Sequence, residues 1–225
     1  MSLSPIKSLL RGIKPPSPSL QELLLRAALA ESGFRNQEYQ IRIDHINGVS
    51  NVNEVSLGIV YPREFQVKAF KQIGVKTLKY SFDGVITATG GRQQMLKPFF
   101  NRADSEVVHS KKGRIYLYKG RFNMNYYKKL GATQFCLCPH HVDWPGPAET
   151  MWTYRFVEAC LTFAIPVVFR NAPLGDAFIN GFRYLYDDEI HDYKESDAIH
   201  NWELASKRFF LTETSISRIC MNMRI

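Results

Sequence analysis

The sequence is poor in cysteine, with four cysteines in 225 residues. That number is too small for a disulfide framework in a chain of this length. Cys136 and Cys138 form a Cys-x-Cys motif in a strand-like run, but a zinc site would need a second matching pair, and the sequence has none. Reduced thiols in the core are the simpler interpretation, and metal ligation is the alternative.

The sequence also lacks a long hydrophobic run. No stretch stays apolar over the roughly 20 residues that a transmembrane helix needs. The N-terminus has no hydrophobic region followed by a small-residue cleavage site, so it does not look like a signal peptide. We therefore expect a soluble, cytoplasmic protein without a transmembrane segment.

The positive charge of the chain is not concentrated in one place. Its net charge is +8, from 29 Lys and Arg against 21 Asp and Glu. A DNA-binding domain usually gathers such charge on one helix or arm, whereas here the basic residues are spread along the chain. The charge therefore favours a phosphorylated ligand over nucleic acid, without naming that ligand.

Short apolar strands alternate with helical segments over most of the chain. The periodicity predicts helices over residues 21–33, 63–74, 90–98, 123–131 and 147–164, the last being the longest. Strands are predicted over residues 38–46, 56–62, 75–84, 133–139 and 165–169. This alternation predicts an α/β fold, a Rossmann-like parallel sheet with helices on both faces.

Ligands of such sheets bind beyond the carboxyl ends of the strands. Two loops are expected there, SFDGVITATGGR over residues 81–92 and CPHHVDWPGPAET over residues 138–150. The first loop has neither GxGxxG nor the lysine of a P-loop. Its glycine pair opens a helix whose free N–H groups suit a phosphate, and Arg92 could fork two oxygens of a diphosphate. The alternative is a glycine turn with a solvated arginine.

Two charged residues interrupt the apolar segment TYRFVEACLTFAIPVVF. Arg155 and Glu158 are three residues apart, so they lie on one face of the predicted helix, near its middle. A simple intrahelical ion pair is one interpretation. The other is that the guanidinium holds phosphate oxygens of a ligand while the carboxylate accepts hydrogen bonds from ribose hydroxyls.

Read in order, these segments resemble a known family. KYSFDG, the downstream Arg92, YYKKLGATQFCLCP and TYRFVEACLTFAIPVVF look like the C-terminal part of exostosin-family glycosyltransferases. That pattern has F-x-G, an arginine, F-C-L-x-P, S-x-R-x-x-E-A and I-P-V. It covers residues 77 to about 170, with Thr153 in place of the serine and Phe163-Ala164 in place of A-G-C.

The resemblance implies a Rossmann-like nucleotide-sugar-binding domain of a reduced GT-B type over residues 75–225. It also implies metal-independent, inverting transfer from a nucleoside diphosphate sugar, with a UDP-sugar as the leading candidate, and with no cofactor. By motif position, Glu158 would bind the donor ribose, and Arg155 would neighbour the diphosphate. Arg92 would hold the departing phosphate oxygens, and Gly84 would let the backbone approach the ligand.

The acceptor side is less well defined by the sequence. Residues 1–74 are too short for the family's usual acceptor domain, so a reduced acceptor part, a homo-oligomer or a partner protein would have to complete that site. Inverting transfer needs a general base close to the acceptor hydroxyl. Candidates are Asp44 and His45 in the N-terminal part, and His140, His141 and Asp143 in the second loop. Each could equally be a solvated loop residue.

The acidic run YDDEIHDY, residues 186–193, has two interpretations. In the other large glycosyltransferase fold, such a cluster holds a metal ion, but there it ends a strand near the middle of the nucleotide-binding domain. Here it follows the donor motifs, so a solvated acidic turn is the simpler prediction.

Three classes of function are compatible with these features. The leading hypothesis is a glycosyltransferase acting on a glycan or glycoprotein hydroxyl. The second is a non-catalytic nucleotide-sugar or glycan-binding protein, and the third is an anion-binding module supported by charge alone.

Overall fold

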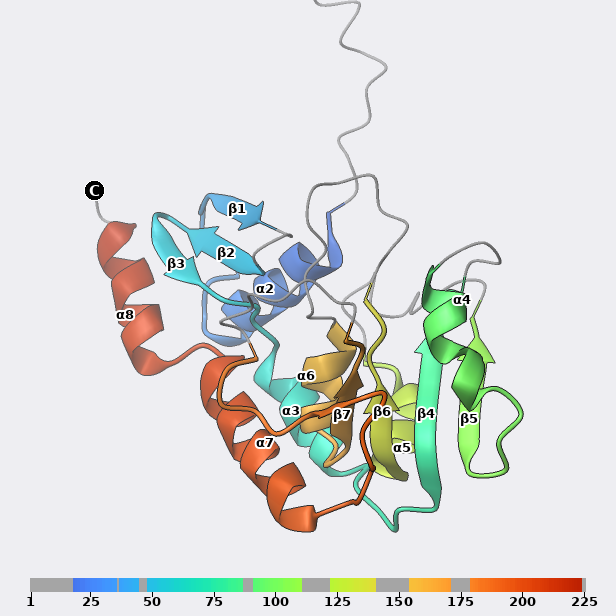
Figure 1. Ribbon diagram of the computed structural model, residues 1–225. Helices are drawn as coiled ribbons and strands as arrows, with labels where there is room; N and C mark the ends of the chain where they lie inside the picture. The colour runs from blue at the N-terminus through green and yellow to red at the C-terminus, as the bar shows by residue number, and fades with distance from the viewer. Residues whose placement is uncertain are drawn as a thin grey trace, which may run out of the picture.

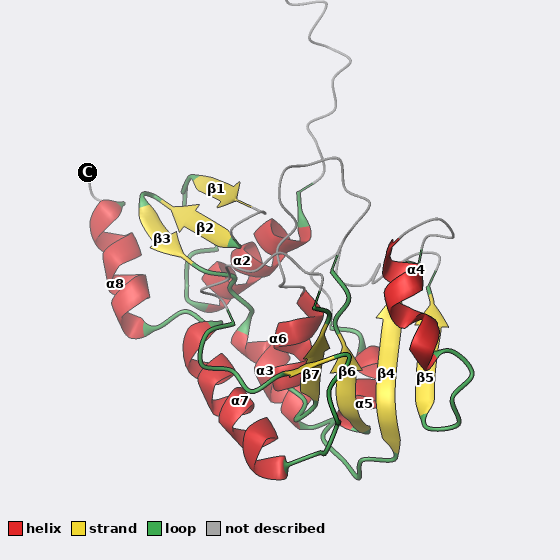
Figure 2. Ribbon diagram, in the orientation of Figure 1, coloured by secondary structure: helices red, strands yellow, loops and turns green. Residues whose placement is uncertain are grey.

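The computed structural model describes residues 18–35, 37–44, 48–86, 91–110, 122–140, 154–170 and 179–223. Figure 1 shows the arrangement of its elements, and Figure 2 distinguishes helices from strands. In chain order, the N-terminal elements are α2 (Leu20–Glu31), β1 (Ile41–Asp44), β2 (Val49–Val52), β3 (Val55–Leu57) and α3 (Arg63–Phe70). The remaining elements are β4 (Leu78–Gly84), α4 (Gly91–Leu96), the 3-10 helix η2 (Lys97–Phe99), β5 (Ser105–His109), α5 (Met124–Gly131), β6 (Thr133–Leu137), α6 (Tyr154–Cys160), β7 (Ile165–Val168), β8 (Leu185–Tyr186), α7 (Glu195–Arg208) and α8 (Glu213–Asn222).

The larger sheet has five parallel strands in the order β5-β4-β6-β7-β8. From β4 the chain first moves outward to the edge strand β5, and then returns across β4 to continue through β6, β7 and β8. The direction of winding therefore reverses between β4 and β6. This is the Rossmann-like α/β architecture that the alternation of helices and strands predicts.

The central strands β6 and β7 of this sheet are buried on both faces. In β6, Phe135 and Leu137 face one core cluster, together with Leu96 and Phe99 of the α4 and η2 segment. Cys136 faces the opposite cluster, which contains residues of α3, α5 and α6. Helices on both faces are thus confirmed, and they explain why β6 and β7 are mostly apolar.

The cysteines of the central region contribute to this packing. Cys136, Cys138 and Cys160 are free thiols and are buried. Burial raises the pKa of the Cys138 and Cys160 thiols well above their usual value. Both thiols therefore stay protonated near neutral pH, and they pack as small apolar side chains.

The N-terminal residues form a smaller antiparallel sheet, β1-β2-β3, with α2 packed on it. The C-terminal helix α8 completes this unit, as Figure 1 shows, because Leu211 and Ile219 belong to the same core cluster as Leu25, Leu29 and Val52. The Asn222 Nδ2 also donates to the carbonyl oxygen of Asn53, at 2.8 Å. The two ends of the described chain therefore pack together beside the parallel sheet.

Some predicted elements differ from the structure. The strand expected over residues 56–62 covers only Val55–Leu57, and it belongs to the antiparallel sheet. Residues 141–153 lie outside the described residues, so only the end of the helix expected over residues 147–164 is seen. That helix ends at Cys160, because Phe163 adopts a left-handed backbone conformation with φ of 56° and the Ala164 N–H turns back to the carbonyl of Ala159. Among the described helices, the longest is α7.

No helix within the described ranges has both the length and the apolar character needed to cross a bilayer.

Candidate functional site

Buried charged and titratable side chains gather at the carboxyl ends of β4 and β6, where the winding of the sheet reverses. In open α/β sheets, the crevice at this reversal is the usual place for a ligand. Arg92 comes from α4, Arg155 and Glu158 come from α6, and His140 follows β6. All four are at most 7% exposed. Their burial rules out the interpretation of Arg92 as a solvated arginine.

Arg155 reaches from α6 over the end of β4. Its Nε donates to the carbonyl oxygen of Asp83 at 3.1 Å, and its guanidinium lies 4.4 Å from the ring centre of Phe82. Phe82 faces the core cluster that contains α4 residues, whereas α6 packs on the opposite face of the sheet. The Arg155 guanidinium therefore crosses the carboxyl edge of the sheet and lies on the α4 side.

Gly84 is needed for this approach. A Cβ atom at residue 84 would lie 2.1 Å from the Nη2 of Arg155, far inside contact distance. The sequence predicts a glycine that lets the backbone approach a ligand, and in the structure the group in close approach is a guanidinium of the protein itself. Gly84 and Arg155 thus form one unit at the end of β4.

Glu158 lies one turn deeper in α6 and has no exposed surface. Its Oε2 accepts a hydrogen bond of 2.7 Å from the hydroxyl of Tyr126, in the first turn of α5. Because α5 and α6 both begin at the carboxyl edge, this bond joins the two helices just beneath it. Arg155 and Glu158 therefore have separate long-range partners on β4 and α5.

Arg92 and His140 lie close enough to influence one another electrostatically. The Nη1 of Arg92 donates to the carbonyl oxygen of Val85 at 3.0 Å. Burial, and next the neighbouring Arg92 guanidinium, lower the pKa of His140, while Asp187 opposes this shift. His140 is thus favoured in its neutral form, in which it can accept a proton. Since α4 has only six residues, a phosphate here would depend on these side chains rather than on the helix start.

The other predicted residues are not brought to this edge by the described structure. Asp44 is the last residue of β1, half-buried in the antiparallel sheet, where it is in register with Val49. His45, His141 and Asp143 lie outside the described residues.

The acidic run contacts a neighbouring arginine. Arg170 Nε donates to Asp188 Oδ1 at 2.7 Å, its Nη2 lies 3.5 Å from Glu189 Oε1, and the Arg170 N–H donates to Asp187 Oδ1. Within the described ranges, no group of three or more His, Cys, Asp or Glu side chains has an arrangement that could hold a metal ion. The run is a turn whose acidic side chains contact Arg170 beyond the end of β7.

A separate pocket lies between the N-terminal unit and α3. It is lined by Ala28, Glu31, Ser32, Tyr61, Arg63 and Leu211. The Glu31 carboxylate there accepts the N–H groups of Arg63 and Glu64, at 2.7 and 3.1 Å. These bonds cap the first turn of α3, whose N-cap residue Pro62 has no side-chain cap of its own. The polar lining of this pocket therefore has a structural explanation.

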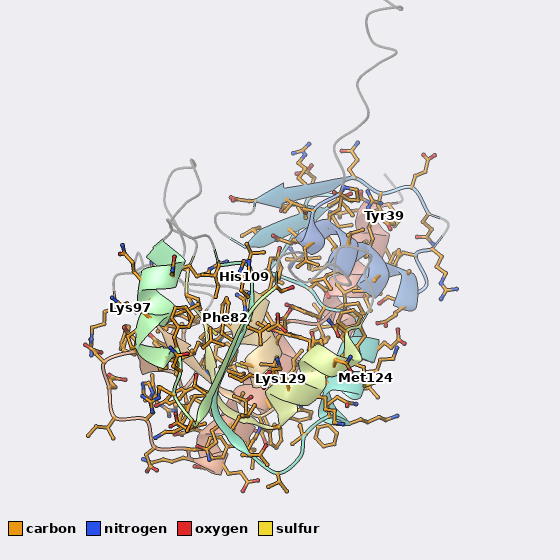
Figure 3. All side chains as sticks on the ribbon, turned by 90° about the vertical axis from the view of Figure 1, so that its right-hand side faces the viewer. Tyr39, Phe82, Lys97, His109, Met124 and Lys129 are labelled. Carbon is orange, nitrogen blue, oxygen red and sulfur yellow. The ribbon has the colours of Figure 1, made fainter. Side chains whose placement is uncertain are left out.

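Sequence reasoning missed two residues at this edge, Tyr126 and His109. Tyr126 is next to a second tyrosine in an amphipathic helix, and the pattern does not tell which of them contacts a carboxylate. His109 ends β5, a strand that the sequence pattern does not reveal. Figure 3 shows His109 and Phe82 near each other on neighbouring strands. Only the strand register reveals that His109 lies beside Gly84.

A scan against protein-family models gives no match for this chain, and a search of curated proteins finds no similar sequence. Inferences about its function therefore depend on its own residues and their geometry.

Proposed function

We propose that the chain binds a nucleoside diphosphate sugar at the carboxyl edge of the parallel sheet and transfers the sugar to a hydroxyl of a glycan or glycoprotein. One observation carries the proposal. Two buried guanidinium groups, those of Arg92 and Arg155, lie at the strand ends where the winding of the sheet reverses. Guanidinium groups bind the oxygens of phosphates in bidentate fashion. A diphosphate is the ligand that suits this pair best.

In this proposal, the arginines stabilise the leaving group. When the bond between the anomeric carbon and the diphosphate breaks, negative charge develops on the phosphate oxygens. Fixed cations in a buried site stabilise such charge without having to reorganise. Arg92 and Arg155 would supply this stabilisation in a metal-independent, inverting transfer of the GT-B type.

Glu158 would recognise the nucleoside part of the donor. A carboxylate can accept hydrogen bonds from two ribose hydroxyls. The 2.7 Å bond from Tyr126 restricts the orientation of the carboxylate. Tyr126 would then be a positioning residue, because it acts through Glu158 and not on the ribose itself.

The acceptor would approach from the N-terminal unit formed by α2, the antiparallel sheet and α8. Asp44 and His45 remain candidates for the general base there, with His140, His141 and Asp143 as candidates on the donor side. His140 has support from its environment, since its lowered pKa favours the neutral, proton-accepting form. The base would take the proton of the acceptor hydroxyl as that oxygen attacks the anomeric carbon.

A non-catalytic nucleotide-sugar or glycan-binding protein is the second candidate. Its support is the small size of the N-terminal unit, whose sheet has only three short strands in the described residues. In that case the donor site would bind its nucleotide-sugar ligand without transferring the sugar. A partner protein or a second copy of the chain would complete the acceptor site if turnover occurs.

A thermal-shift screen with UDP, GDP, CMP and their sugars tests the proposal, because a ligand that binds only the folded state raises the melting temperature. We expect one nucleoside diphosphate to raise it. Arg155→Lys and Glu158→Gln should remove most of that shift, whereas Arg102→Gln, on an exposed arginine, should keep it. If no nucleotide stabilises the wild-type chain, the donor site is refuted. A donor-hydrolysis assay then separates the transferase from the binding protein.

A further inference from the structure

His109 lies beside the candidate donor site in a position that the proposed function does not yet use. It ends β5 and is the register partner of Gly84 in the parallel ladder. Neighbouring strands lie about 5 Å apart. Val107, two residues earlier on the same face of β5, packs against the core cluster that contains Leu96 and Phe99. His109 is therefore on the α4 side of the sheet, the side to which the Arg155 guanidinium crosses.

A hydrogen bond fixes the tautomer of His109. The backbone N–H of Ile86 donates to its Nδ1 at 3.0 Å, so Nδ1 carries no proton. In a neutral imidazole the proton then lies on Nε2, which makes Nε2 a donor. The residue is exposed, and within the described part of the chain no partner is found for Nε2. His109 thus presents one oriented N–H donor at the carboxyl edge.

The same bond links His109 to Arg92. The carbonyl of Val85 and the N–H of Ile86 belong to one peptide group, and Arg92 Nη1 donates to that carbonyl while His109 accepts from that N–H. The peptide group is therefore held from both sides. Its orientation, and with it the anchor of the Arg92 guanidinium, depends on the His109 ring.

We infer that His109 is a third anion-binding residue of the donor site, which donates a hydrogen bond from Nε2 to a phosphate oxygen of the diphosphate. This inference rests on the proposed function. Its Nδ1 bond to Ile86 holds the ring in the donating tautomer. The three donors then surround Gly84 from three elements, with Arg92 on α4, Arg155 on α6 and His109 on β5.

Two substitutions test the roles of the two ring nitrogens of His109 separately. His109→Asn places an amide oxygen near the Nδ1 position, so it keeps an acceptor for Ile86 but loses the distal donor. His109→Gln places its amide N–H groups near the Nε2 position and loses the Nδ1 acceptor. Calorimetric titration of the full chain measures the affinity of each variant for UDP, inorganic pyrophosphate and uridine. Lys97→Gln, on the exposed surface of η2, controls for a general loss of positive charge near α4.

We expect His109→Asn to bind UDP and pyrophosphate roughly tenfold more weakly, the effect of losing one hydrogen bond to a charged group. Its affinity for uridine should not change, which a merely structural role would not explain. His109→Gln should lose less affinity for UDP and pyrophosphate than His109→Asn does. If His109→Asn binds pyrophosphate as the wild type does, or if His109→Gln is the weaker variant, the Nε2 contact is refuted while the donor site stands. If the wild-type chain binds neither UDP nor pyrophosphate, the donor site and this inference both fail.

Discussion

Two glycines at opposite edges of the parallel sheet have neighbours that leave no room for a side chain. At Gly131, which ends α5, a Cβ atom would lie 1.9 Å from the carbonyl oxygen of Gln72. At Gly84, which ends β4, it would lie 2.1 Å from the Nη2 of Arg155. The first neighbour is backbone, which the fold fixes, whereas the second is the far end of a flexible side chain. The same geometric crowding therefore serves packing at one edge and positions a cation at the other.

The cations at the two edges also differ, since the one at the amino edge holds the fold together and those at the carboxyl edge lie at the candidate site. At the amino edge, the Nζ of Lys76 donates to the carbonyl oxygens of Gly131 and Thr162, at 3.0 and 2.9 Å. These carbonyls lie at the C-terminal ends of α5 and α6, where the helix dipoles attract positive charge. Lys76 thus joins two helix ends. At the carboxyl edge, Arg92 and Arg155 donate to the backbone carbonyls of Val85 and Asp83 at the end of β4, where they can also face an anion.

Gly131→Ala should produce the largest effect on stability. The added methyl group meets the Gln72 backbone, so the 71–77 connection or α5 has to move. Overpacking of this kind costs about 3 kcal/mol of unfolding free energy at its upper range. Urea unfolding followed by circular dichroism measures it. Gly74→Ala is the matched control, because a Cβ atom there meets nothing within 4 Å. Equal unfolding midpoints for the two variants would contradict the packing role of the amino edge.

The pH dependence of stability should reveal the Lys76 contact. Burial lowers the pKa of Lys76 from 10.5 to about 8, and Glu195 opposes this shift. Between pH 8 and 10.5 the unfolded chain therefore binds more protons than the folded chain, so the unfolding free energy rises with pH across this window. The total rise is at most about 3 kcal/mol.

Comparing Lys76→Met with the wild type separates the contribution of Lys76 to the unfolding free energy from that of other groups that titrate at high pH. Urea unfolding at pH 7.5, 9 and 10.5 should show a smaller rise for Lys76→Met. Lys128→Met, on an exposed lysine of α5, should keep the wild-type rise. If Lys76→Met and the wild type have parallel curves, the Lys76 amine is not desolvated at the helix ends.

Gly84→Ala should weaken ligand binding while the chain stays folded. The methyl group displaces the Arg155 guanidinium, which can move without disturbing the backbone. We expect UDP to bind about tenfold more weakly, the effect of losing one charge-assisted contact. The unfolding free energy should fall by less than it does in Gly131→Ala. A Gly84→Ala chain that is destabilised as strongly as Gly131→Ala would remove the difference between the two edges.

The sequence pattern predicts the elements whose signal is local. The strands β6 and β7 are apolar runs between turns, and β4 alternates apolar and polar residues. Helices α2, α3 and α5 have clear amphipathic spacing. The edge strand β5 was not predicted, because it is short and only partly buried. The strand expected over residues 56–62 is wrong beyond Leu57. Ile59 and Tyr61 are buried there because the connection enters the core, where the Tyr61 N–H donates to Phe209.

The candidate site is predictable only in part, because the contacts of its residues depend on the tertiary arrangement of strands and helices. Arg155 and Glu158 stand out as charges in an apolar helix, and the structure places both in the interior. Their partners cannot be predicted, because Asp83 and Tyr126 become neighbours only through strand order and helix packing. The neighbour of Gly84 cannot be predicted for the same reason, since the sequence does not reveal that a guanidinium from α6 occupies the space beside it.

The smallest effects are expected in the acidic turn, which differs from both edges because its charges are exposed and paired with each other. The Asp188 carboxylate is engaged by Arg170, so a divalent cation would have to displace a guanidinium to bind there. Exposed ion pairs contribute little to stability. Asp188→Asn should therefore leave the melting temperature and UDP affinity unchanged, with or without manganese. If UDP binding requires manganese and Asp188→Asn abolishes that requirement, the acidic turn is a metal site. The two buried arginines would then not be sufficient for the diphosphate.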